Sequence, residues 1–588
     1  SKMYAIRGVT ESGFLEPMTS VAIPFKSITN KPDKDILLLA ELKQNFIDLA
    51  EQFDVEIIVS KERIYSSPSS MEGGISFYVH LLGSESHVST AYLHLWAVIE
   101  MYRNSKSNAT PLFFECMDLE ASSLLPTAIG VEMANIKNIL ASYKTHIHVP
   151  SLIHCFKLDA GRSENIRPQL FFTGQTHSLI IAAKDAISKA VEKYRASLYY
   201  RRFCNISPQK LLFIRKHYRP ELNRLMVKFQ SFIRVTDSYV EFQSPCLALL
   251  ESVTKVFTIN VLHQIVEIQI TLNEKSTFPF ELIRSVCLDD SNGPILAVIL
   301  TESANQLLVV GNHSENTSWT KAGQPRLAKS GIIECLFLIL SALPSNSLAQ
   351  LKSVFEIHVD YEDFISGKKN GKVTRIMETI PCLIKLERLE EDNAMFLTLI
   401  ADSLEDFNET FSLVINELPA EESFYIPEVY HRPVIGAGGS VIQATMKKYN
   451  VFVRFSNSFF LPQNELCHVR YDNVIIRCPY KNVSSISSAK NELNQLARDY
   501  GALQPRTLIR FSPGQYRYVL SSSSRGSQTI GNIEKKHNVY VMFPFVEPSE
   551  GYFLEIRGND NAPANAALEL ISSSFGMETE IRLNKNIV

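Results

Sequence analysis

Three glycines, Gly436, Gly438 and Gly439, are the residues whose type and spacing point most clearly to a chemical task. They lie in residues 430–442, which read Tyr-His-Arg-Pro-Val-Ile-Gly-Ala-Gly-Gly-Ser-Val-Ile, between two short stretches of helical character. Glycine lacks a Cβ and accepts positive φ, so Gly436 and Gly439 would form a tight loop that lets another molecule approach the main chain. The helix expected after the loop would direct its free N–H groups at that molecule, an arrangement that suits phosphate. The segment therefore predicts a loop that binds a nucleic-acid backbone.

Two other interpretations of these glycines compete with this one, a dinucleotide-binding fingerprint and a plain structural turn. The fingerprint requires a third glycine where this chain has Val441, and an acidic residue about 20 positions further on. Residues 453–461 contain no carboxylate. Pro433 would also remove a hydrogen-bond donor from a central strand. These departures argue against a dinucleotide site, whereas the structural turn stays open.

The elements that must position the loop recur along the chain. A shift of 88 residues lays 535–543, Lys-Lys-His-Asn-Val-Tyr-Val-Met-Phe, on 447–455, Lys-Lys-Tyr-Asn-Val-Phe-Val-Arg-Phe. In both segments the apolar spacing changes from three, which is typical of a helix, to two, which is typical of a half-buried strand. Ser524 and Ser527 fall where the loop glycines would be. The pattern indicates a repeated supersecondary unit that keeps its core and varies its loop.

The same frame predicts about seven repeats, with a period of roughly 70 to 95 residues. The predicted fold class is α/β (α+β), a tandem array of β-α-α-β-β-α units of which several are degenerate. The predicted boundaries are 17–104, 109–199, 200–263, 264–345, 350–418, 421–502 and 503–578 for repeats one to seven. The candidate loops are 40–43, 130–133, 216–219, 367–370, 436–439 and 524–527, and the divergent fourth repeat has none that can be placed.

Charge is distributed unevenly over a chain whose formal net charge is only −3. Residues 431–546 hold 15 Lys and Arg against 5 Asp and Glu, a net charge of +10. By contrast, residues 1–430 carry −9 and residues 547–588 carry −4. Basic charge thus collects on the repeat with the glycine loop and on its neighbour, as the neutralisation of phosphates requires.

Composition and motif spacing argue against several other classes of protein. The nine cysteines form no C-x-x-C pair, so neither a zinc site nor a disulfide framework is indicated, and a reducing compartment fits. The zinc-protease, nucleophile-elbow and phosphate-loop motifs are absent, and His431, the one candidate general base, has no nucleophile near it in sequence. The longest apolar run, 331–343, is too short to span a bilayer. We therefore expect a non-catalytic cytoplasmic protein without cofactor, metal or membrane partner.

The segment 430–439 and the recurring frame resemble the type I KH domain, and the whole chain resembles tandem KH proteins of the vigilin and bicaudal-C-like kind. The resemblance is strongest in the sixth repeat, good in the second, fifth and seventh, and weak in the others. It implies that each repeat is a type I KH-like unit, a fold that grips about four nucleotides of single-stranded RNA between the glycine loop and the second strand.

Carried over to this chain, the resemblance implies a set of RNA contacts. In the sixth repeat these are Arg432, Val434, Ile435, Gly436, Ala437, Gly438, Gly439, Ile442, Lys447, Lys448 and Arg454, of which the three aliphatic residues would line or support the groove and Arg454 would face bases from the strand. In the other repeats they are Gly367, Lys368, Lys369 and Asn370 of the fifth, and Arg525 of the seventh. Loops of the family usually carry Lys or Arg between the glycines. Here phosphate attraction must come from Arg432, Lys447 or Lys448, although Lys447 and Lys448 also fit a solvated helix end.

The predicted function is binding of single-stranded RNA, chiefly mRNA, through repeats five to seven in post-transcriptional regulation. Asn370 is expected to replace a loop glycine because Asn accepts left-handed backbone angles. Lys43, Met133 and Arg219 put larger side chains at that position, so repeats one to four are expected to serve as scaffold or as surfaces for protein partners. The alternative is a protein–protein interaction scaffold whose repeats have all lost RNA binding, which the many non-standard loops favour.

Overall fold

The computed structural model describes most of the chain, in segments that fall into two compact parts. These parts are Ser1–Ser197 and Leu198–Val588, and we describe each by itself. The described residues are 18–26, 42–51, 55–60, 75–106, 112–149, 168–195, 198–273, 297–300, 305–312, 318–319, 325–326, 332–341, 343, 347–367, 370–389, 394–456, 469–511, 515, 526–542 and 552–574. Within them, no helix has the length and apolar character needed to cross a membrane.

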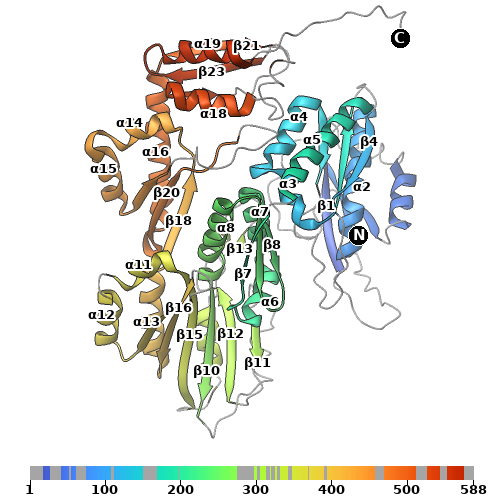
Figure 1. Ribbon diagram of the computed structural model, residues 1–588. Helices are drawn as coiled ribbons and strands as arrows, with labels where there is room; N and C mark the ends of the chain where they lie inside the picture. Colours follow the sequence, from blue (N-terminus) through green and yellow to red (C-terminus); the bar gives the residue numbers. More distant parts are fainter. Residues whose placement is uncertain are drawn as a thin grey trace, which may run out of the picture. The chain divides into compact units, whose positions relative to one another are not determined.

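The N-terminal part contains two repeats, each built on a three-stranded antiparallel sheet (Figure 1). The first consists of β1 (Met18–Lys26), a helix over residues 42–51, β2 (Glu56–Ser60), β3 (Ile75–Ser84) and α2 (Glu85–Lys106). The second consists of β4 (Phe113–Asp118), α3 (Leu125–Ile129), α4 (Ala134–Tyr143), β5 (Thr145–His148), β6 (Gln169–Gly174) and α5 (His177–Arg195). The third strand lies in the middle of both sheets, in the orders β1-β3-β2 and β4-β6-β5.

Three repeats of the C-terminal part have the same strand order, first, third, second. The third repeat consists of β7 (Tyr199–Phe203), α6 (Pro208–His217), α7 (Arg219–Phe229), β8 (Phe232–Val235), β9 (Val240–Ser244) and α8 (Leu247–Asn260). The sixth consists of β18 (Pro419–Phe424), the 3-10 turn η6 (Glu428–Tyr430), α14 (His431–Ile435), α15 (Ser440–Tyr449), β19 (Phe452–Phe455), β20 (Val474–Pro479) and α16 (Ser484–Leu503). The described elements of the seventh are β21 (Arg506–Phe511), α18 (Gly526–His537), β22 (Val539–Met542), β23 (Tyr552–Gly558) and α19 (Ala562–Ser574).

The fourth and fifth repeats share one six-stranded sheet, in the order β11-β12-β10-β15-β17-β16. The fourth supplies β10 (Ile265–Leu272), β11 (Ala297–Leu300), β12 (Gln306–Asn312) and α10 (Ile332–Ser341). The fifth supplies β15 (Leu348–His358), α11 (Glu362–Ser366), α12 (Gly371–Thr379), β16 (Leu383–Leu389), β17 (Ala394–Ala401) and α13 (Leu404–Glu417). The first strands of the two repeats, β10 and β15, pair antiparallel, so each half of the sheet keeps the order found in the other repeats. The second strands, β11 and β16, remain at the two outer edges.

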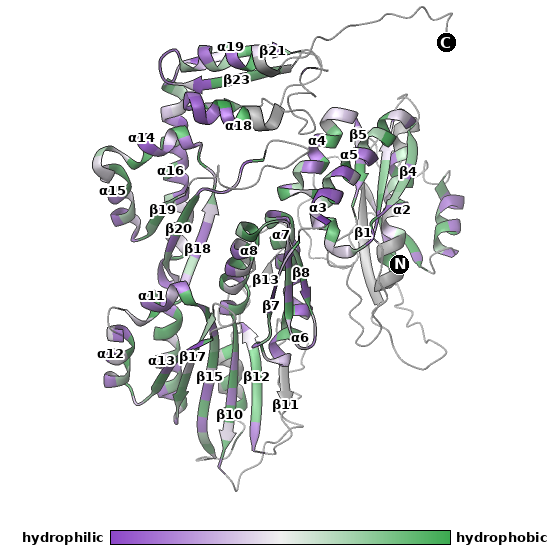
Figure 2. Cartoon of the chain, in the orientation of Figure 1, coloured by the Kyte–Doolittle hydropathy of each residue, from purple (hydrophilic) through white to green (hydrophobic). Residues whose placement is uncertain are grey.

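The two apolar spacings expected from the sequence build the core of each repeat. In the sixth, β20 alternates buried Val474, Ile476 and Cys478 with partly exposed residues, so one face of the sheet packs on the helices. The helices return side chains such as Ile442 and Leu493 to the same cluster. Figure 2 shows this division in colour, with banded strands in the shared sheet and long hydrophilic stretches on α16 and α18. The predicted switch from helix to strand is confirmed.

Buried ion pairs join the repeats of the C-terminal part. Lys210 of α6 donates to the backbone oxygen of Val354 at 3.1 Å and pairs with Glu356, and both charged side chains are almost fully buried. A buried pair of this kind loses solvation on folding and is costly to break on one side only. Lys210 therefore forms a specific buried contact between the third repeat and β15 of the fifth.

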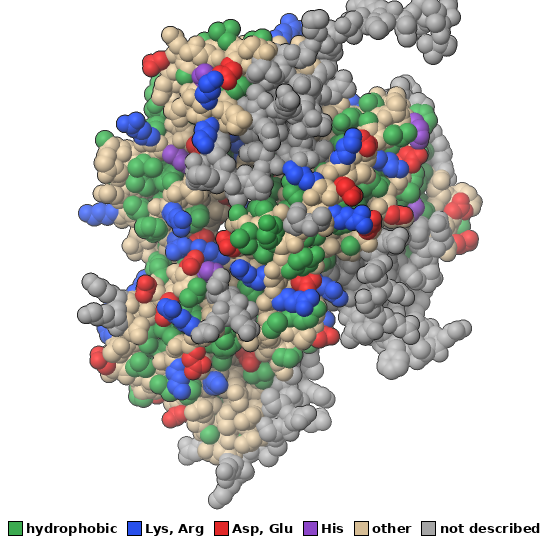
Figure 3. Space-filling view, viewed as in Figure 1, with side chains coloured by type: hydrophobic (Ala, Val, Ile, Leu, Met, Phe, Trp, Pro, Cys, Tyr) green, Lys and Arg blue, Asp and Glu red, His purple; other side chains and the backbone are tan. Residues whose placement is uncertain are grey.

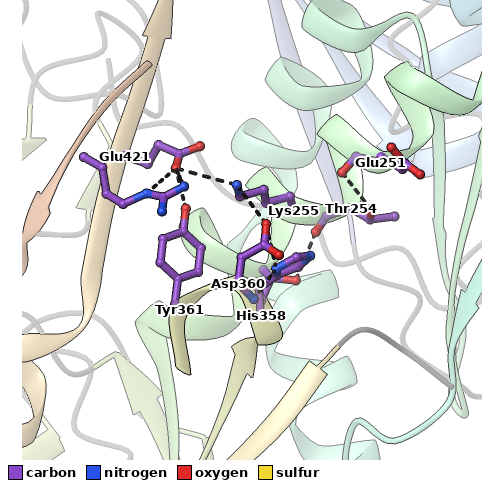
Figure 4. A network of polar contacts seen from close by, with 9 residues as sticks. Glu251, Thr254, Lys255, His358, Asp360, Tyr361 and Glu421 are labelled. Atoms are coloured by element: carbon purple, nitrogen blue, oxygen red, sulfur yellow. Dashed lines mark hydrogen bonds and ion pairs between the residues drawn. The ribbon is translucent and has the colours of Figure 1, made fainter. Parts of the chain in front are cut away.

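A second polar network links the third, fifth and sixth repeats (Figure 4). The Nζ of Lys255 on α8 lies 3.3 Å from a carboxylate oxygen of Asp360 and 3.9 Å from one of Glu421. Tyr361 donates its hydroxyl to Glu421, which also accepts from Arg477 at 3.0 Å. Burial raises the pKa of Tyr361, so its hydroxyl keeps the proton that it donates. The network therefore links β18 and β20 of the sixth repeat to the third and fifth repeats.

Candidate nucleic-acid interface

The loop between the first two helices has one backbone conformation in the second and sixth repeats, and the first and fourth loop residues of the fifth repeat share it. Its first residue is a glycine with φ between +73° and +80° and ψ near 170°, and the values are Gly130 78°, Gly367 73° and Gly436 80° for φ. In each loop the residue three positions on donates its N–H to the carbonyl of that glycine: Met133 to Gly130 at 3.2 Å, Asn370 to Gly367 at 3.1 Å and Gly439 to Gly436 at 3.0 Å. The loop is thus a common structure and not a feature of the sixth repeat alone.

The first glycine is required because the next helix packs directly against it. A Cβ built on Gly436 would lie 2.5 Å from the Cγ2 atom of Val441 and 2.9 Å from its backbone nitrogen. The residue five positions after the first glycine of the second repeat, Asn135, lies as close, with its Cγ 2.7 Å from a Cβ built on Gly130. Contacts under 3.0 Å leave no room for a side chain, so this glycine is structural in both repeats.

The fourth loop position is left-handed in all three repeats, whatever residue occupies it. Gly439 has φ +79°, Asn370 has φ +59° and Met133 has φ +63°. The expectation that Asn370 would accept a left-handed angle is confirmed. In the second repeat Glu132 is also left-handed, with φ +50°, so two bulky residues hold a conformation that costs about 1 to 2 kcal/mol each.

The third repeat has no loop of this kind. Helix α6 ends at His217 and α7 begins at Arg219, and Tyr218 between them has φ −101°. None of residues 216–219 has positive φ. Residues 216–219, the candidate loop of this repeat, therefore lack the glycine-loop geometry, and the backbone there offers no matching approach for a ligand.

The surface beside the loop of the sixth repeat lies between α15 and β19. The sulfur of Met446 on α15 accepts the N–H of Val453 at 3.3 Å, so the helix caps the outer edge of the strand. Ile435 and Phe455 are partly buried against the same core. Figure 3 shows hydrophobic side chains gathered over the α14 and α15 region, with Lys and Arg at its margin. Apolar surface with a basic rim is what unstacked bases and their phosphates require.

Methionine at this position recurs, a signal that the sequence analysis missed. In the fifth repeat the sulfur of Met377 accepts the N–H of Ile384 at 3.4 Å, ten and seventeen residues after the first loop glycine, as in the sixth. In the seventh repeat Glu534 takes that place and accepts the N–H of Val541 at 2.8 Å. Aligning the repeats by the loop glycine and comparing the tenth residue would have revealed it.

The structure divides the predicted contacts of the sixth repeat into a core group and a surface group. Val434 and Ile442 are buried, so they support the loop from beneath. Ala437 and Gly438 are exposed at its tip. Arg454 is exposed, but it alternates along β19 with Val453, which faces the helices, so it lies on the opposite face of the sheet. Its contact with bases therefore remains a prediction from the resemblance alone.

The basic residues near the loop differ in how free their charges are. Arg432 and Lys447 are exposed and have no acidic partner among the described residues. Lys448 instead pairs with Glu492 of α16, and this hydrogen bond raises the pKa of the ammonium group. The pairing recurs in the seventh repeat, where Lys536 lies 2.8 Å from Glu569. The second lysine of each Lys-Lys pair thus forms an ion pair with the last helix of its own repeat.

His431 has a structural role in this geometry. Its Nε2 donates to the backbone oxygen of Ile426 at 3.0 Å, and its ring meets that of Phe455 edge-on at 4.9 Å. Burial lowers the pKa of the imidazole, which favours the neutral ring. The described residues also contain no cluster of three or more His, Cys, Asp or Glu that could hold a metal.

Three predicted contacts cannot be placed. Lys368, Lys369 and Arg525 lie outside the described residues, and so do residues 40 and 41 of the candidate loop in the first repeat. Gly367 and Asn370, which flank the two lysines, have the common loop conformation.

Comparison with known sequences places the repeats. Family models match five segments: 112–198 the YLL032C second KH domain-containing protein, 202–266 the YLL032C third KH domain, 346–410 the YLL032C fifth KH domain-like, 423–497 the YLL032C fourth KH domain-containing protein and 506–576 the YLL032C fifth KH domain-containing protein. The matches cover the second, third, fifth, sixth and seventh repeats. A solved structure described as KH domains also matches, at 9% identity and a TM-score of 0.23 over 66% of this chain and 85% of that chain, too low to establish a shared arrangement.

Two curated relatives agree with the domain matches, and one of them spans the whole chain. KH domain-containing protein YLL032C of Saccharomyces cerevisiae is 44% identical over 594 residues, which cover 100% of this chain and 70% of the relative. K homology domain-containing protein 4 of Mycosarcoma maydis is 32% identical over 233 residues, 40% of this chain and 16% of that protein. Tandem KH domains support a nucleic-acid-binding role in general, and proteins of this kind are generally non-catalytic. The chain belongs to the family of tandem KH-domain proteins.

Proposed function

We propose that this protein binds single-stranded RNA, with the sixth repeat as its principal site. The loop of that repeat carries the proposal, because Ala437 and Gly438 form an exposed tip without bulky side chains. Arg432 before the loop and Lys447 on the following helix supply positive charge that no described carboxylate neutralises. A phosphate at the tip would meet main-chain N–H groups at the start of α15 and the cation of Arg432, whereas Lys447, in the last turn of α15, would meet a second phosphate further along the strand.

The wider role that we propose is post-transcriptional regulation of mRNA in the cytoplasm, by binding and without catalysis. The fifth repeat would add a weaker contact, since it retains the loop backbone around Gly367 and Asn370. The first four repeats would serve as a scaffold. The buried pair between Lys210 and Glu356 supports that role for the third repeat, because it fixes this repeat on the fifth.

A second candidate function, binding of protein partners, is favoured by the loop of the second repeat. Glu132 and Met133 are exposed there, and Met133 keeps 39% of its surface accessible. An acidic side chain at the tip opposes phosphate, whereas an exposed methionine suits an apolar protein surface. We assign this role to the second repeat only.

The experiment that tests the proposal adds two negative charges beside the proposed phosphate. Gly438 has φ +59° and is a poor place for a new side chain. Ala437→Asp with Ser440→Asp is the better pair, because Ser440 is exposed and begins α15, where an acidic residue suits the helix dipole. At close range each like charge opposes a phosphate by roughly 1 kcal/mol even when well solvated. The affinity for a short single-stranded RNA should fall at least tenfold.

A matched control places the same two charges at the other end of the repeat. Ser484 and Ser488 are exposed in the first turns of α16. Asn482, just before that helix, donates to the backbone oxygen of Asn450 at 3.4 Å, beyond the C-terminal end of α15, about 15 Å from the loop. Because Lys447 lies in the last turn of α15, Ser484→Asp with Ser488→Asp should weaken RNA binding much less than the loop pair does. Equal affinity of both variants for RNA would rule out the sixth repeat as the principal site.

A further inference from the structure

The surface of the seventh repeat that corresponds to the proposed RNA site is covered by the sixth repeat. Shifted by 88 residues, Met446 of α15 corresponds to Glu534 of α18, and Val453 of β19 corresponds to Val541 of β22. Both strands lie at the edge of their sheets, and in both the N–H of this valine donates to the side chain at the equivalent helix position. The two surfaces are therefore equivalent in backbone and in position within the fold.

Arg470 of the sixth repeat occupies this surface of the seventh. Its guanidinium donates to both carboxylate oxygens of Glu534, at 2.8 Å for the first, and to the backbone oxygen of Val541 at 2.9 Å. The same group lies 4.8 Å from the ring centroid of Tyr540. A planar cation that lies near an aromatic ring and hydrogen-bonds to the edge strand uses the contacts that a nucleobase would use.

Neighbouring aromatic side chains extend the contact. Tyr430, at the start of the first helix of the sixth repeat, meets Tyr540 edge-on at a centroid distance of 5.9 Å. The hydroxyl of Tyr425 accepts from Arg470 at 3.1 Å. By contrast, no hydrogen bond or ion pair from another repeat reaches β19 or β16 within the described part of the chain. Of these three edge strands, only β22 is used by a neighbouring repeat.

The contact also bears on the site of the sixth repeat. Arg470 lies three residues before Asn473, a buried side chain that hydrogen-bonds to both the N–H and the carbonyl of Ile426, at 2.9 Å and 2.7 Å. Ile426 in turn accepts from His431, the first residue of α14, which leads into the glycine loop. Arg470 thus lies three residues from a short chain of polar contacts that ends at the helix before the loop.

We propose that the surface of the seventh repeat formed by α18 and β22 is an internal docking site for the part of the sixth repeat around Arg470. This surface then takes no RNA strand of its own. This inference rests on the proposed function for the role of the sixth repeat. The two repeats then act as one module with a single RNA groove, in which Arg470 and Glu534 are positioning residues. Glu534 is only 3% exposed, so its carboxylate depends on Arg470 for neutralisation.

The docking itself is tested without RNA, by hydrogen exchange on the full chain. Arg470→Ala should speed amide exchange of residues 539–542 at least tenfold. Arg498→Ala, which removes an exposed arginine that bonds to Gln495 on α16, is the control and should leave that segment unchanged. Unchanged exchange in Arg470→Ala would overturn the proposal.

The consequence for RNA is tested by ultraviolet crosslinking of a short single-stranded RNA to the full chain, read by mass spectrometry. In the parent, crosslinks should fall in residues 436–455 and spare Tyr540. Arg470→Ala combined with Glu534→Met removes the guanidinium that covers the surface together with the buried carboxylate that it neutralises. The double variant therefore leaves no unpaired buried charge that could unfold the repeat. It should add crosslinks at Tyr540. Crosslinks at Tyr540 in the parent would overturn the inference. Absence of crosslinks in both repeats of the parent would instead count against the proposed function, and the exchange experiment would still decide the docking.

Discussion

The loops of the second and sixth repeats have the same backbone and opposite surfaces. Both begin with a glycine near φ +80° and close with the same hydrogen bond, from the fourth residue to the first. The sixth presents Ala437 and Gly438, whereas the second presents Glu132 and Met133. The surrounding fold therefore holds this loop in shape, because Glu132 and Met133 keep left-handed backbone angles that bulky residues disfavour. The ability of the loop to bind RNA then depends on the side chains at its tip.

The largest effect is expected from removing the feature that both loops share. Gly436→Ala would place a Cβ 2.5 Å from Val441 at a backbone angle that side chains avoid, and Gly130→Ala would meet Asn135 in the same way. Each change should destabilise its repeat by about 3 kcal/mol. Hydrogen exchange in α15 and α4 measures the loss. Gly371→Ala is the control, because nothing lies within 4 Å of a Cβ there. Tolerance of either glycine change would break the claim of a common structure.

A smaller effect is expected from relieving strain in the second repeat. Met133→Gly should stabilise that repeat by about 1 kcal/mol, since glycine adopts φ +63° without the cost that methionine carries. Met133→Ala removes the same exposed side chain but keeps a Cβ, so it should bring no gain. Slower exchange of α4 amides in Met133→Gly alone would show that the left-handed angle of Met133 is strained. Equal exchange rates in the two variants would contradict this.

Smaller still is the effect of single charges near the sixth loop. Lys447→Gln should lower the slope of log affinity for RNA against log salt by about 0.7, the value for one phosphate contact on a single strand. Lys448→Gln should leave the slope nearly unchanged, because Lys448 is paired with Glu492. Binding titrations at several salt concentrations provide the measurement. A lower salt slope in Lys448→Gln, with no change in Lys447→Gln, would show that the ion pair between Lys448 and Glu492 opens when RNA binds.

The smallest effect concerns pH. Burial lowers the pKa of His431 in the folded chain, so the unfolded chain takes up the proton more readily. The stability that the neutral ring contributes is present above the unfolded pKa of about 6.5 and is lost as the pH falls below it. Urea unfolding at pH 7.5 and pH 5.5 should show a smaller acid loss in His431→Gln than in the parent. An equal loss of unfolding free energy in the parent and in His431→Gln would show that His431 does not cause the acid sensitivity.

Much of the fold follows from local spacing in the sequence. The change from a spacing of three to a spacing of two marks where α15 passes into β19, and the same pattern marks where α18 passes into β22. Gly130, Gly367 and Gly436 share a positive φ because each glycine precedes a helix that packs against it. These features depend on residues close together in the chain, which a pattern search reads directly.

The joints between repeats were not predictable in the same way. The pairing of β10 with β15 depends on two exposed strand edges meeting, and the residues between the strands carry no sign of it. Arg470 and Glu534 are 64 residues apart, and each alone is an ordinary charged residue. Only the place of Glu534, where two other repeats have methionine, hints at a partner. Contacts between repeats arise from side chains that local patterns do not couple.

Exchange of the loop tips tests whether RNA binding depends on the side chains that the loop presents. Ala437→Val, Gly438→Glu and Gly439→Met give the sixth repeat the tip of the second, on a backbone that the second repeat already maintains with those residues. We predict that α15 and β19 keep their amide protection to within about 4 kcal/mol, at about 1 to 2 kcal/mol for each of the two new left-handed side chains. We also predict that the affinity for short single-stranded RNA falls at least tenfold. A folded variant that binds RNA as tightly as the parent would contradict the account.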